Sequence, residues 1–539
     1  MRGLRAALAL CLPLIVASTA MAQVVQTSAG VPVKTQAGLV GGITLPSGVR
    51  AWLGVPFAAP PVRDLRWRDP RPVAAWTGVW NADRPAPECI QPLRGRSINH
   101  YFGEEATSED CLYLNIWAPA QPAPPGKPYP VVAWIYGGAF NVGSASMANY
   151  SGEPLAAKGV VYVALSYRVG ALGFLAHPGL TAEGAGHSGN YGLKDQVAGL
   201  QWIQSNIKGF GGDPANVTVV GQSAGSMSIS LLQSSPVARG LFHRVVGMSG
   251  SSFGDLMAPA PLADAEQEGV ALQQALGADS IEGMRDIPAD RLIAVAAGVP
   301  RRPIVLDGQL LALAPPASFA ARQQSDVPAM IGFTRDESFR SLGPINNPAD
   351  FEAAVRKAFP ANAAQILKRY PAATDEAARR AARDLQRDAS VGSQMAGWAG
   401  AQAASGRAPV YPYFFTRVHP YTPGISFADH DPATVGSYHT ADVPYWLGTL
   451  DSLNRFRTTR DWNTDDRALS AQMMDALLSF ARTGNPGSGW PVYGDKAPRM
   501  RLLGQGGGTI AWPHHADLPL LVGAPVAPPP APGRPNVRD

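Results

Sequence analysis

The chain has 539 residues, of which 46% are hydrophobic and 16% charged, a balance typical of globular proteins that argues against a disordered one. Its 45 Lys and Arg residues and 41 Asp and Glu residues leave a net charge of +4, without a long basic run. Because nucleic-acid-binding proteins concentrate positive charge on one face, this composition does not support a nucleic acid as partner.

The first 22 residues have the pattern of an export signal. Two arginines within residues 1–5 precede an apolar run at 6–17, which is too short to span a bilayer. Small residues follow, with Ala20 and Ala22 at the positions of an A-x-A cleavage site. We therefore expect cleavage after Ala22 and a mature protein that is secreted or periplasmic. No later stretch is apolar and long enough to predict a membrane span.

Export changes the interpretation of the cysteines. The chain has three, and Cys11 belongs to the signal, so that Cys89 and Cys111 remain. An even pair in an oxidising compartment predicts one disulfide. Two cysteines without paired histidines do not predict a zinc site.

Strands and helices are expected to alternate along most of the mature chain. Short strands and turns come first, at 38–54. Apolar or alternating runs then predict strands at 112–117, 131–136, 159–167, 217–220, 243–249, 327–334 and 408–418. Helical spacing or alanine-rich composition predicts helices at 192–207, 262–276 and 351–369.

This alternation predicts the fold class. Strands that alternate with helices favour an α/β fold with a large, mostly parallel central sheet and helices on both faces. The short strands near the N-terminus favour a small antiparallel β region beside it. We expect one domain over 23–523, followed by a proline-rich tail at 524–539 with the composition of a disordered segment.

Two stretches match the pattern G-x-S-x-G, which places a nucleophilic serine at a sharp turn between a strand and a helix. The first contains Ser223, follows the predicted strand 217–220 and precedes a segment without proline. The second contains Ser252, but Pro259 and Pro261 soon follow it. We therefore expect Ser223 to be the nucleophile and Ser252 to lie in a loop.

A nucleophilic serine needs a basic histidine and an acid that orients it, and on such a sheet they follow the serine in the order Ser, acid, His. The acid should come directly after a strand, as Asp336 and Glu337 do. The candidates for the base lie beyond the last clear strand and are His419, His430 and His439. The residues by themselves leave both choices open.

The oxyanion that develops during acyl transfer needs backbone N–H groups from two places. One is the residue after the nucleophile, Ala224. The other is a glycine-rich turn after an earlier strand, and WIYGGAF supplies it with Gly137 and Gly138 directly after 131–136.

Several stretches together resemble the type-B carboxylesterase and cholinesterase-like family of α/β-hydrolases. They occur in family order between about residues 38 and 500 and are WTGVWNADRPAPEC, SEDCLYLNIWAP, WIYGGAF, SYRVGALGFL, FGGDPANVTVVGQSAGS, IGFTRDES and YHTADVPYWLG. The resemblance implies an α/β-hydrolase fold and a serine hydrolase of carboxylic esters that requires no metal or organic cofactor.

The resemblance also assigns residues. It implies a catalytic triad of Ser223, Glu337 and His439. It implies an oxyanion hole formed by the amides of Gly138, Ala139 and Ala224. Structural residues that match the family are the disulfide partners Cys89 and Cys111 and the ion pairs Arg66–Glu109 and Arg168–Asp195.

Two departures from the family pattern bear on choline-like substrates. Gln222 stands where a glutamate is usual before the serine, which predicts weaker attraction for cationic substrates. The segment between Cys89 and Cys111 is short and lacks the tryptophan with which cholinesterases hold choline. Choline esters are therefore poor candidates.

A third departure concerns the acyl pocket. Gly298 and Pro300 fall near positions where cholinesterases have bulky aromatic residues, and Arg301 and Arg302 follow directly. These residues predict a roomy pocket for bulky or carboxylated acyl groups, as in the polycarboxylic, fumonisin-type esters that some exported bacterial relatives cleave. The alternative is that both arginines face solvent or pair with local acids.

The predicted reaction is hydrolysis of a small-molecule ester through an acyl-enzyme on Ser223. One alternative is a non-catalytic ligand-binding or adhesion module on the same fold, but this chain keeps all three triad residues. The other is a serine amidase or peptidase, which uses the same triad chemistry and differs only in its substrate.

Overall fold

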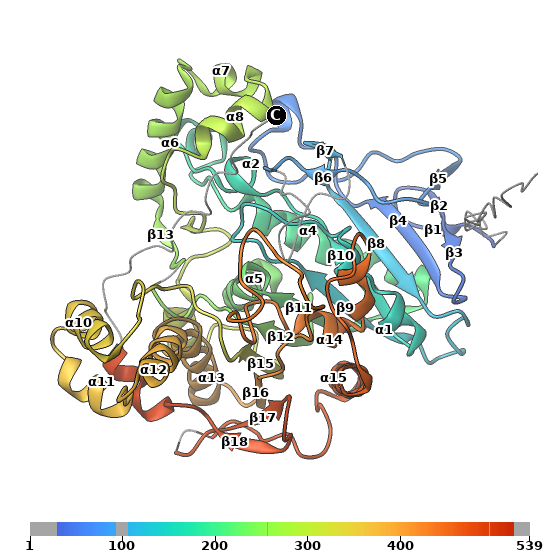
Figure 1. Cartoon of the computed structure of the whole chain (residues 1–539). Coiled ribbons are helices and arrows are strands. Elements are labelled where there is room, and N and C mark those ends of the chain that lie inside the picture. Colours follow the sequence, from blue (N-terminus) through green and yellow to red (C-terminus); the bar gives the residue numbers. More distant parts are fainter. Residues whose placement is uncertain (1–29, 93–105, 256, 495, 522–539) are drawn as a thin grey trace, which may run out of the picture.

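The computed structural model describes residues 30–92, 106–255, 257–494 and 496–521 (Figure 1). The predicted signal and the predicted tail lie outside these residues. Among the described helices, none is long and apolar enough to cross a membrane.

An eleven-stranded sheet runs through the centre of the molecule (Figure 1). From edge to edge its strands are β18 (Thr509–Ala511), β17 (Arg499–Leu503), β16 (Val410–Phe415), β15 (Ala329–Thr334), β12 (Arg244–Met248), β11 (Gly212–Gln222), β9 (Tyr129–Ile135), β10 (Val161–Leu165), β8 (Tyr113–Ala118), β4 (Arg50–Pro56) and β3 (Ile43–Thr44). Neighbours from β17 to β10 pair in parallel, and the strands at both edges pair antiparallel. The predicted large, mostly parallel sheet is confirmed, and every strand predicted from residue 112 onward has a counterpart.

A small three-stranded sheet forms near the N-terminus from β1 (Val33–Lys34), β2 (Leu39–Gly41) and β5 (Val79–Asn81). The pairing of β1 with β2 is antiparallel, as expected. β5 joins β2 in parallel, because the chain first passes through β3 and β4 of the large sheet and only then returns. Two-stranded pairs are formed by β6 (Glu88–Cys89) with β7 (Thr107–Ser108) and by β13 (Ala260–Pro261) with β14 (Val305–Leu306).

Helices cover both faces of the large sheet (Figure 1). α1 (Glu153–Ala157) connects β9 to β10, and α4 (Tyr191–Asn206) then leads back past β9 to β11. Because crossovers between parallel strands are right-handed, this reversal puts α1 and α4 on opposite faces. α5 (Ala224–Ser234) and α13 (Ser393–Ser405) pack on the face of α4, and α15 (Thr464–Thr483) packs on the face of α1.

The reversal also determines where a ligand can bind. β9 and β11 are neighbours, but the chain leaves their carboxyl ends in opposite directions. In open α/β sheets, ligands bind in the crevice at such a switch point. The glycine-rich turn that begins at Gly137 follows β9 and Ser223 follows β11, so both lie at this crevice.

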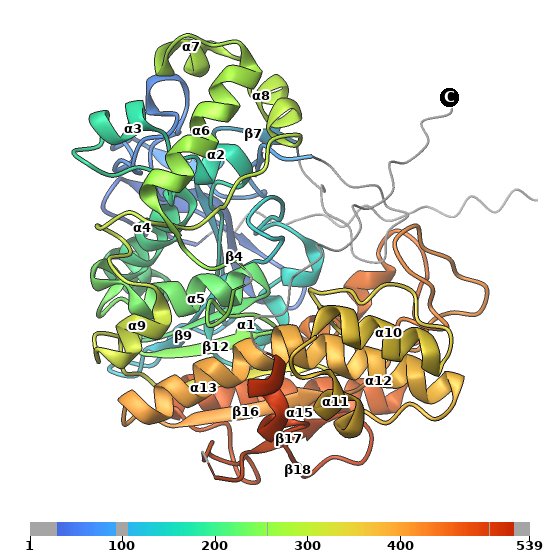
Figure 2. The same ribbon diagram turned by 90° about the vertical axis from the view of Figure 1, so that its left-hand side faces the viewer.

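The remaining helices gather at two ends of the molecule (Figure 2). One group contains α6 (Leu262–Leu276), α7 (Ile281–Asp286) and α8 (Ala289–Ala296), next to α2 (Gly170–Phe174) and α3 (Pro178–Glu183). The other contains α10 (Pro348–Ala358), α11 (Ala363–Arg369) and α12 (Asp375–Arg387). Two short helices, α9 (Pro315–Ala320) and α14 (Val443–Leu447), belong to neither group. α6 has the predicted bounds. The helix predicted at 351–369 is two helices, because Pro360 between them lacks an N–H and its ring blocks the preceding turn.

Candidate active site

Ser223 stands alone at a sharp turn between β11 and α5. The strand ends at Gln222 and the helix begins at Ala224, and Ser223 between them has φ 56° and ψ −124°. L-residues rarely adopt such a conformation, which is strained and occurs at nucleophile elbows. The Ser223 N–H donates to the carbonyl oxygen of Met248 at 2.8 Å, which ties the turn to β12.

Packing around the turn requires both glycines of the pattern. A Cβ on Gly225 would lie 2.0 Å from the carbonyl oxygen of Ile135 in β9. A Cβ on Gly221 would lie 2.7 Å from the backbone of Gly225. The glycines therefore let α5 approach the sheet closely enough to form the turn.

The second G-x-S-x-G match has a different setting. Residues 251–255 form neither helix nor strand, as expected for a loop. The Ser252 N–H donates to Ser230 Oγ at 3.0 Å, while the buried Ser252 Oγ has no hydrogen-bond partner among the described residues. No acid or histidine of the described chain bonds to this hydroxyl.

Glu337 and His439 meet beside the elbow. Glu337 Oε2 lies 2.5 Å from His439 Nδ1, and Glu337 Oε1 accepts a hydrogen bond from the Thr334 N–H at 2.6 Å, at the end of β15. The carboxylate is buried, whereas the imidazole is 30% exposed and open to the crevice. A carboxylate at Nδ1 selects the tautomer with its proton on that nitrogen, which leaves Nε2 as an acceptor.

The alternative acid, Asp336, is held elsewhere. It forms ion pairs with Arg335 and Arg380 and accepts a hydrogen bond from the Ser437 N–H at 2.8 Å. Burial opposes ionisation of Asp336, but these hydrogen bonds and positive charges outweigh it and lower its pKa. Asp336 therefore supports the loop that carries His439 and does not touch the imidazole.

The other two candidate histidines also have partners of their own. His419 is buried, with Nε2 2.8 Å from the carbonyl oxygen of Ala441 and Nδ1 3.2 Å from the hydroxyl of Tyr438. Burial, with a contribution from the charge of Arg460, lowers the pKa of His419 well below its ordinary value. His430 Nδ1 lies 3.1 Å from a carboxylate oxygen of Asp429.

His439 contacts the elbow at Gln222, the residue before the serine. The side-chain amide nitrogen of Gln222 lies 3.1 Å from His439 Nε2, and with the proton on Nδ1 the amide is the donor. Ser223 Oγ and His439 form no hydrogen bond among the described residues. The imidazole therefore lies next to the serine but is bonded to the neighbouring amide.

The turn after β9 packs directly against the elbow. A Cβ on Gly137 would lie 2.6 Å from the carbonyl oxygen of Gln222 and 2.9 Å from Ser223 Cβ. Gly138 and Ala139 have φ 118° and 53°, and their N–H groups donate to none of the described residues. The N–H of Ala224 is at the first position of α5, where helices have no internal acceptor. Three backbone donors are thus available around the serine.

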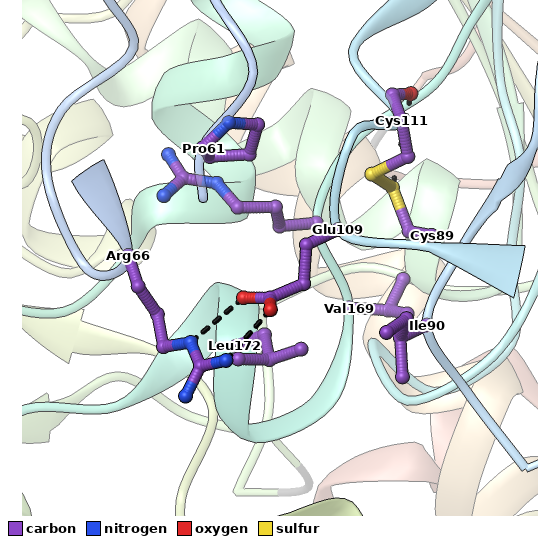
Figure 3. Close-up of a pocket in the computed structure, with 9 residues that line it drawn as sticks. Pro61, Arg66, Cys89, Ile90, Glu109, Cys111, Val169 and Leu172 are labelled. Atoms are coloured by element: carbon purple, nitrogen blue, oxygen red, sulfur yellow. Dashed lines mark hydrogen bonds and ion pairs between the residues drawn. A yellow bond between two sulfur atoms is a disulfide. The ribbon is translucent and has the colours of Figure 1, made fainter. Parts of the chain in front are cut away.

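The residues assigned to structural roles contact one another in pairs. Cys89 and Cys111 form a disulfide, and Arg66 and Glu109 face each other beside it with two hydrogen bonds of 2.7 and 2.6 Å (Figure 3). Arg168 and Asp195 form a second, fully buried pair, with contacts of 2.8 and 2.7 Å between their side chains.

One buried carboxyl group at the site was not found from the sequence. Asp442 lies three residues after His439, is fully buried and accepts a hydrogen bond from the hydroxyl of Tyr413 at 2.7 Å. Burial raises the pKa of Asp442 to about 6, and the charge of Glu337 adds to the effect. An acid directly before the apolar stretch that forms α14 was the signal that could have revealed it.

The four residues predicted for the acyl pocket separate in the structure. Arg301 lines a cavity of about 520 Å³ together with Val299. Gly298 and Pro300 are exposed and are not among the described lining residues. Arg302 is also absent from the lining and forms an ion pair with Glu268 at 2.7 Å.

Comparisons with known proteins place this geometry in context. Residues 29–507 match the model of the carboxylesterase family. The chain is 36% identical over 508 residues to a fumonisin B1 esterase of Sphingopyxis macrogoltabida, which covers 90% of this chain and 89% of that relative. It is 34% identical over 496 residues to a para-nitrobenzyl esterase of Bacillus subtilis (strain 168), with 87% and 94% covered. A solved PNB esterase structure matches with a TM-score of 0.75 at 32% identity, covering 91% of this chain and 99% of that one.

Proposed function

The chain belongs to the carboxylesterase family and is a carboxylic ester hydrolase, and from this premise we propose that it acts through an acyl-enzyme formed on Ser223. The observation that carries the proposal is the 2.5 Å contact between Glu337 and His439 beside a strained serine. This contact supplies a base with a fixed tautomer beside the serine of the elbow.

The proposed steps use only side chains and amides of this site. His439 Nε2 exchanges its contact with Gln222 for the hydroxyl of Ser223 and takes its proton, while Oγ bonds to the ester carbonyl carbon. The oxyanion accepts hydrogen bonds from the amides of Gly138, Ala139 and Ala224. His439 then returns the proton to the alcohol oxygen as the C–O bond breaks, and water repeats both steps to release the acid.

Bulky esters are the substrates that we propose. The residues lining the cavity beside Arg301 are mostly small or aliphatic, which leaves room for a large substituent. Two similar proteins bear the names fumonisin B1 esterase and para-nitrobenzyl esterase, and the para-nitrobenzyl group of the second name is an aromatic substituent.

We also propose that the protein works outside the cytoplasm. The disulfide between Cys89 and Cys111 is of a kind that persists in oxidising compartments. The pattern of the first 22 residues is the second support for export.

Hydrolysis of p-nitrophenyl butyrate by the mature protein tests the proposed chemistry, with the two serine motifs as a matched pair. Ser223→Ala should lower kcat by at least about 10⁴-fold. Ser252→Ala should leave kcat within about twofold, since its hydroxyl has no partner among the described residues and surface or unpaired groups contribute little.

Three results would contradict the proposal. No turnover by folded wild-type protein would favour a binding module. Faster cleavage of the corresponding p-nitroanilide than of the ester would favour an amidase. Retention of activity in Ser223→Ala would exclude this serine as the nucleophile.

A further inference from the structure

A cavity of about 520 Å³ borders the oxyanion turn. Asn141 lines it, and its backbone N–H donates to the carbonyl oxygen of Gly138 at 3.0 Å, while its side-chain amide donates to that of Ala139 at 3.1 Å. Gly170 also lines it, and its N–H donates to the carbonyl oxygen of Phe140 at 2.6 Å. An ester held at the oxyanion amides would therefore have this cavity beside it.

Arg301 is the charged side chain among the described residues of the cavity wall. The other walls are apolar or carry neutral amides, as shown by Ile90, Gln91, Pro92, Asn141, Ile293 and Val299. Ile90 directly follows Cys89 of the disulfide (Figure 3). A cation in such surroundings makes the cavity selective for negative charge, because no described acid in the wall competes for it.

Within the part of the chain that the structure describes, the guanidinium of Arg301 has no counter-ion. It forms no hydrogen bond or ion pair with a described residue, and its Nε is buried without a partner. Burial lowers the pKa of Arg301, and the charge of Glu268 opposes this, yet an arginine keeps its proton at neutral pH. A partly buried cation without a partner gains from a bound anion, which can supply the missing acceptors.

Arg302, the next residue in the same segment, has acidic partners for its guanidinium and its backbone N–H. Its Nε lies 2.7 Å from Glu268 Oε1, and its backbone N–H donates to Glu268 Oε2 at 2.7 Å. A second carboxylate, on Asp264, lies 3.5 Å from Arg302. Glu268 is thus occupied by Arg302, which leaves Arg301 directed to the cavity.

We propose that Arg301 forms an anion subsite, which binds a carboxylate carried by the ester substrate at a distance from the ester group that reacts at Ser223. The inference rests on the proposed function and names its substrate class, namely esters in which a second, free carboxylate is present. The planar guanidinium can hold both oxygens of such a carboxylate at once, whereas a lysine would act as a point charge.

Three chromogenic esters test the subsite and the part of the substrate that reaches it. They are neutral p-nitrophenyl butyrate, mono-p-nitrophenyl glutarate with a carboxylate on the acyl side, and 3-carboxy-4-nitrophenyl butyrate with one on the alcohol side. Arg301→Gln should lower kcat/KM for one of the charged esters on the order of 10- to 100-fold and leave the neutral ester within about twofold. Arg301→Lys should recover part of the loss.

Arg302→Gln is the matched control, because it removes a neighbouring surface cation that already has a partner. It should change the three esters alike. A selective loss on either charged ester supports the subsite and identifies its side. The subsite would be overturned if Arg301→Gln lowered kcat/KM equally for all three esters. It would also be overturned if Arg302→Gln lowered kcat/KM for a charged ester, relative to the neutral one, as much as Arg301→Gln does.

Binding without turnover separates the subsite from the reaction. Calorimetric titration should give pentanoate at least about tenfold tighter binding than the neutral pentanamide in wild type and equal binding of both in Arg301→Gln. If no ester is cleaved but this preference is present, the proposed function fails and the subsite stands. If esters are cleaved and the preference is absent in wild type, the subsite fails and the proposed function stands.

Discussion

Gln222→Glu would place a carboxylate where an amide now lies 3.1 Å from His439 Nε2. At that separation a unit negative charge stabilises the imidazolium by about 1.3 kcal/mol at the dielectric constant of water and by about 5 kcal/mol at an effective value of about 20. Because the imidazole is 30% exposed, the effect should fall toward the lower figure. About 1.36 kcal/mol corresponds to one pH unit, so the acid limb of the kcat/KM profile should move up by about 1 to 2 units.

The assay is kcat/KM for neutral p-nitrophenyl butyrate between about pH 5 and 9, measured at low and high salt. Gln222→Met is the control, since it removes the amide donor without adding charge and should leave the midpoint of the acid limb near that of wild type. Cationic esters should gain from the added carboxylate relative to neutral ones. An unchanged midpoint in Gln222→Glu, or the same shift in both variants, would refute this account of the contact.

Three further predictions concern the acid, the buried carboxyl group and the disulfide. Glu337→Gln removes the carboxylate that fixes the tautomer of His439, and kcat should fall by about 10³- to 10⁴-fold; a loss below tenfold would contradict the role. Burial raises the pKa of Asp442 from 3.8 to about 6, so its contribution to stability is lost as pH rises through this window. Asp442→Asn should therefore gain up to about 3 kcal/mol of unfolding free energy relative to wild type between about pH 4 and 6, measured by urea unfolding, and a difference independent of pH would count against it. Replacing Cys89 and Cys111 by serine opens a loop with a separation of 22 residues and should cost about 3 kcal/mol in the same assay; an unchanged unfolding midpoint would contradict this.

Much of the fold could be predicted because its signals are local. Buried parallel strands appear as continuous apolar runs, and their alternation with helices is visible along the chain. The elbow pattern is local in the same sense, since Gly221, Ser223 and Gly225 lie within five residues, although the contact that requires Gly225 is with Ile135 in the distant strand β9. The bounds of 351–369 were less accurate, because a single proline outweighed the helical composition around it.

The sequence by itself predicted the serine elbow, the glycine-rich turn and the succession of strands along the chain, because each signal depends on residues that are near neighbours in the chain. The residues by themselves left open which acid meets which histidine, and the resemblance implied Glu337 and His439. Only the tertiary structure shows that these two side chains are in contact, since they are 102 residues apart in the chain and Asp336 is the direct neighbour of Glu337. It alone separated Arg301 from Arg302, which the sequence presents as equals. The physical reason is the same in both cases: adjacent side chains on an irregular segment point in different directions, and only the packing of distant segments determines which one finds a partner.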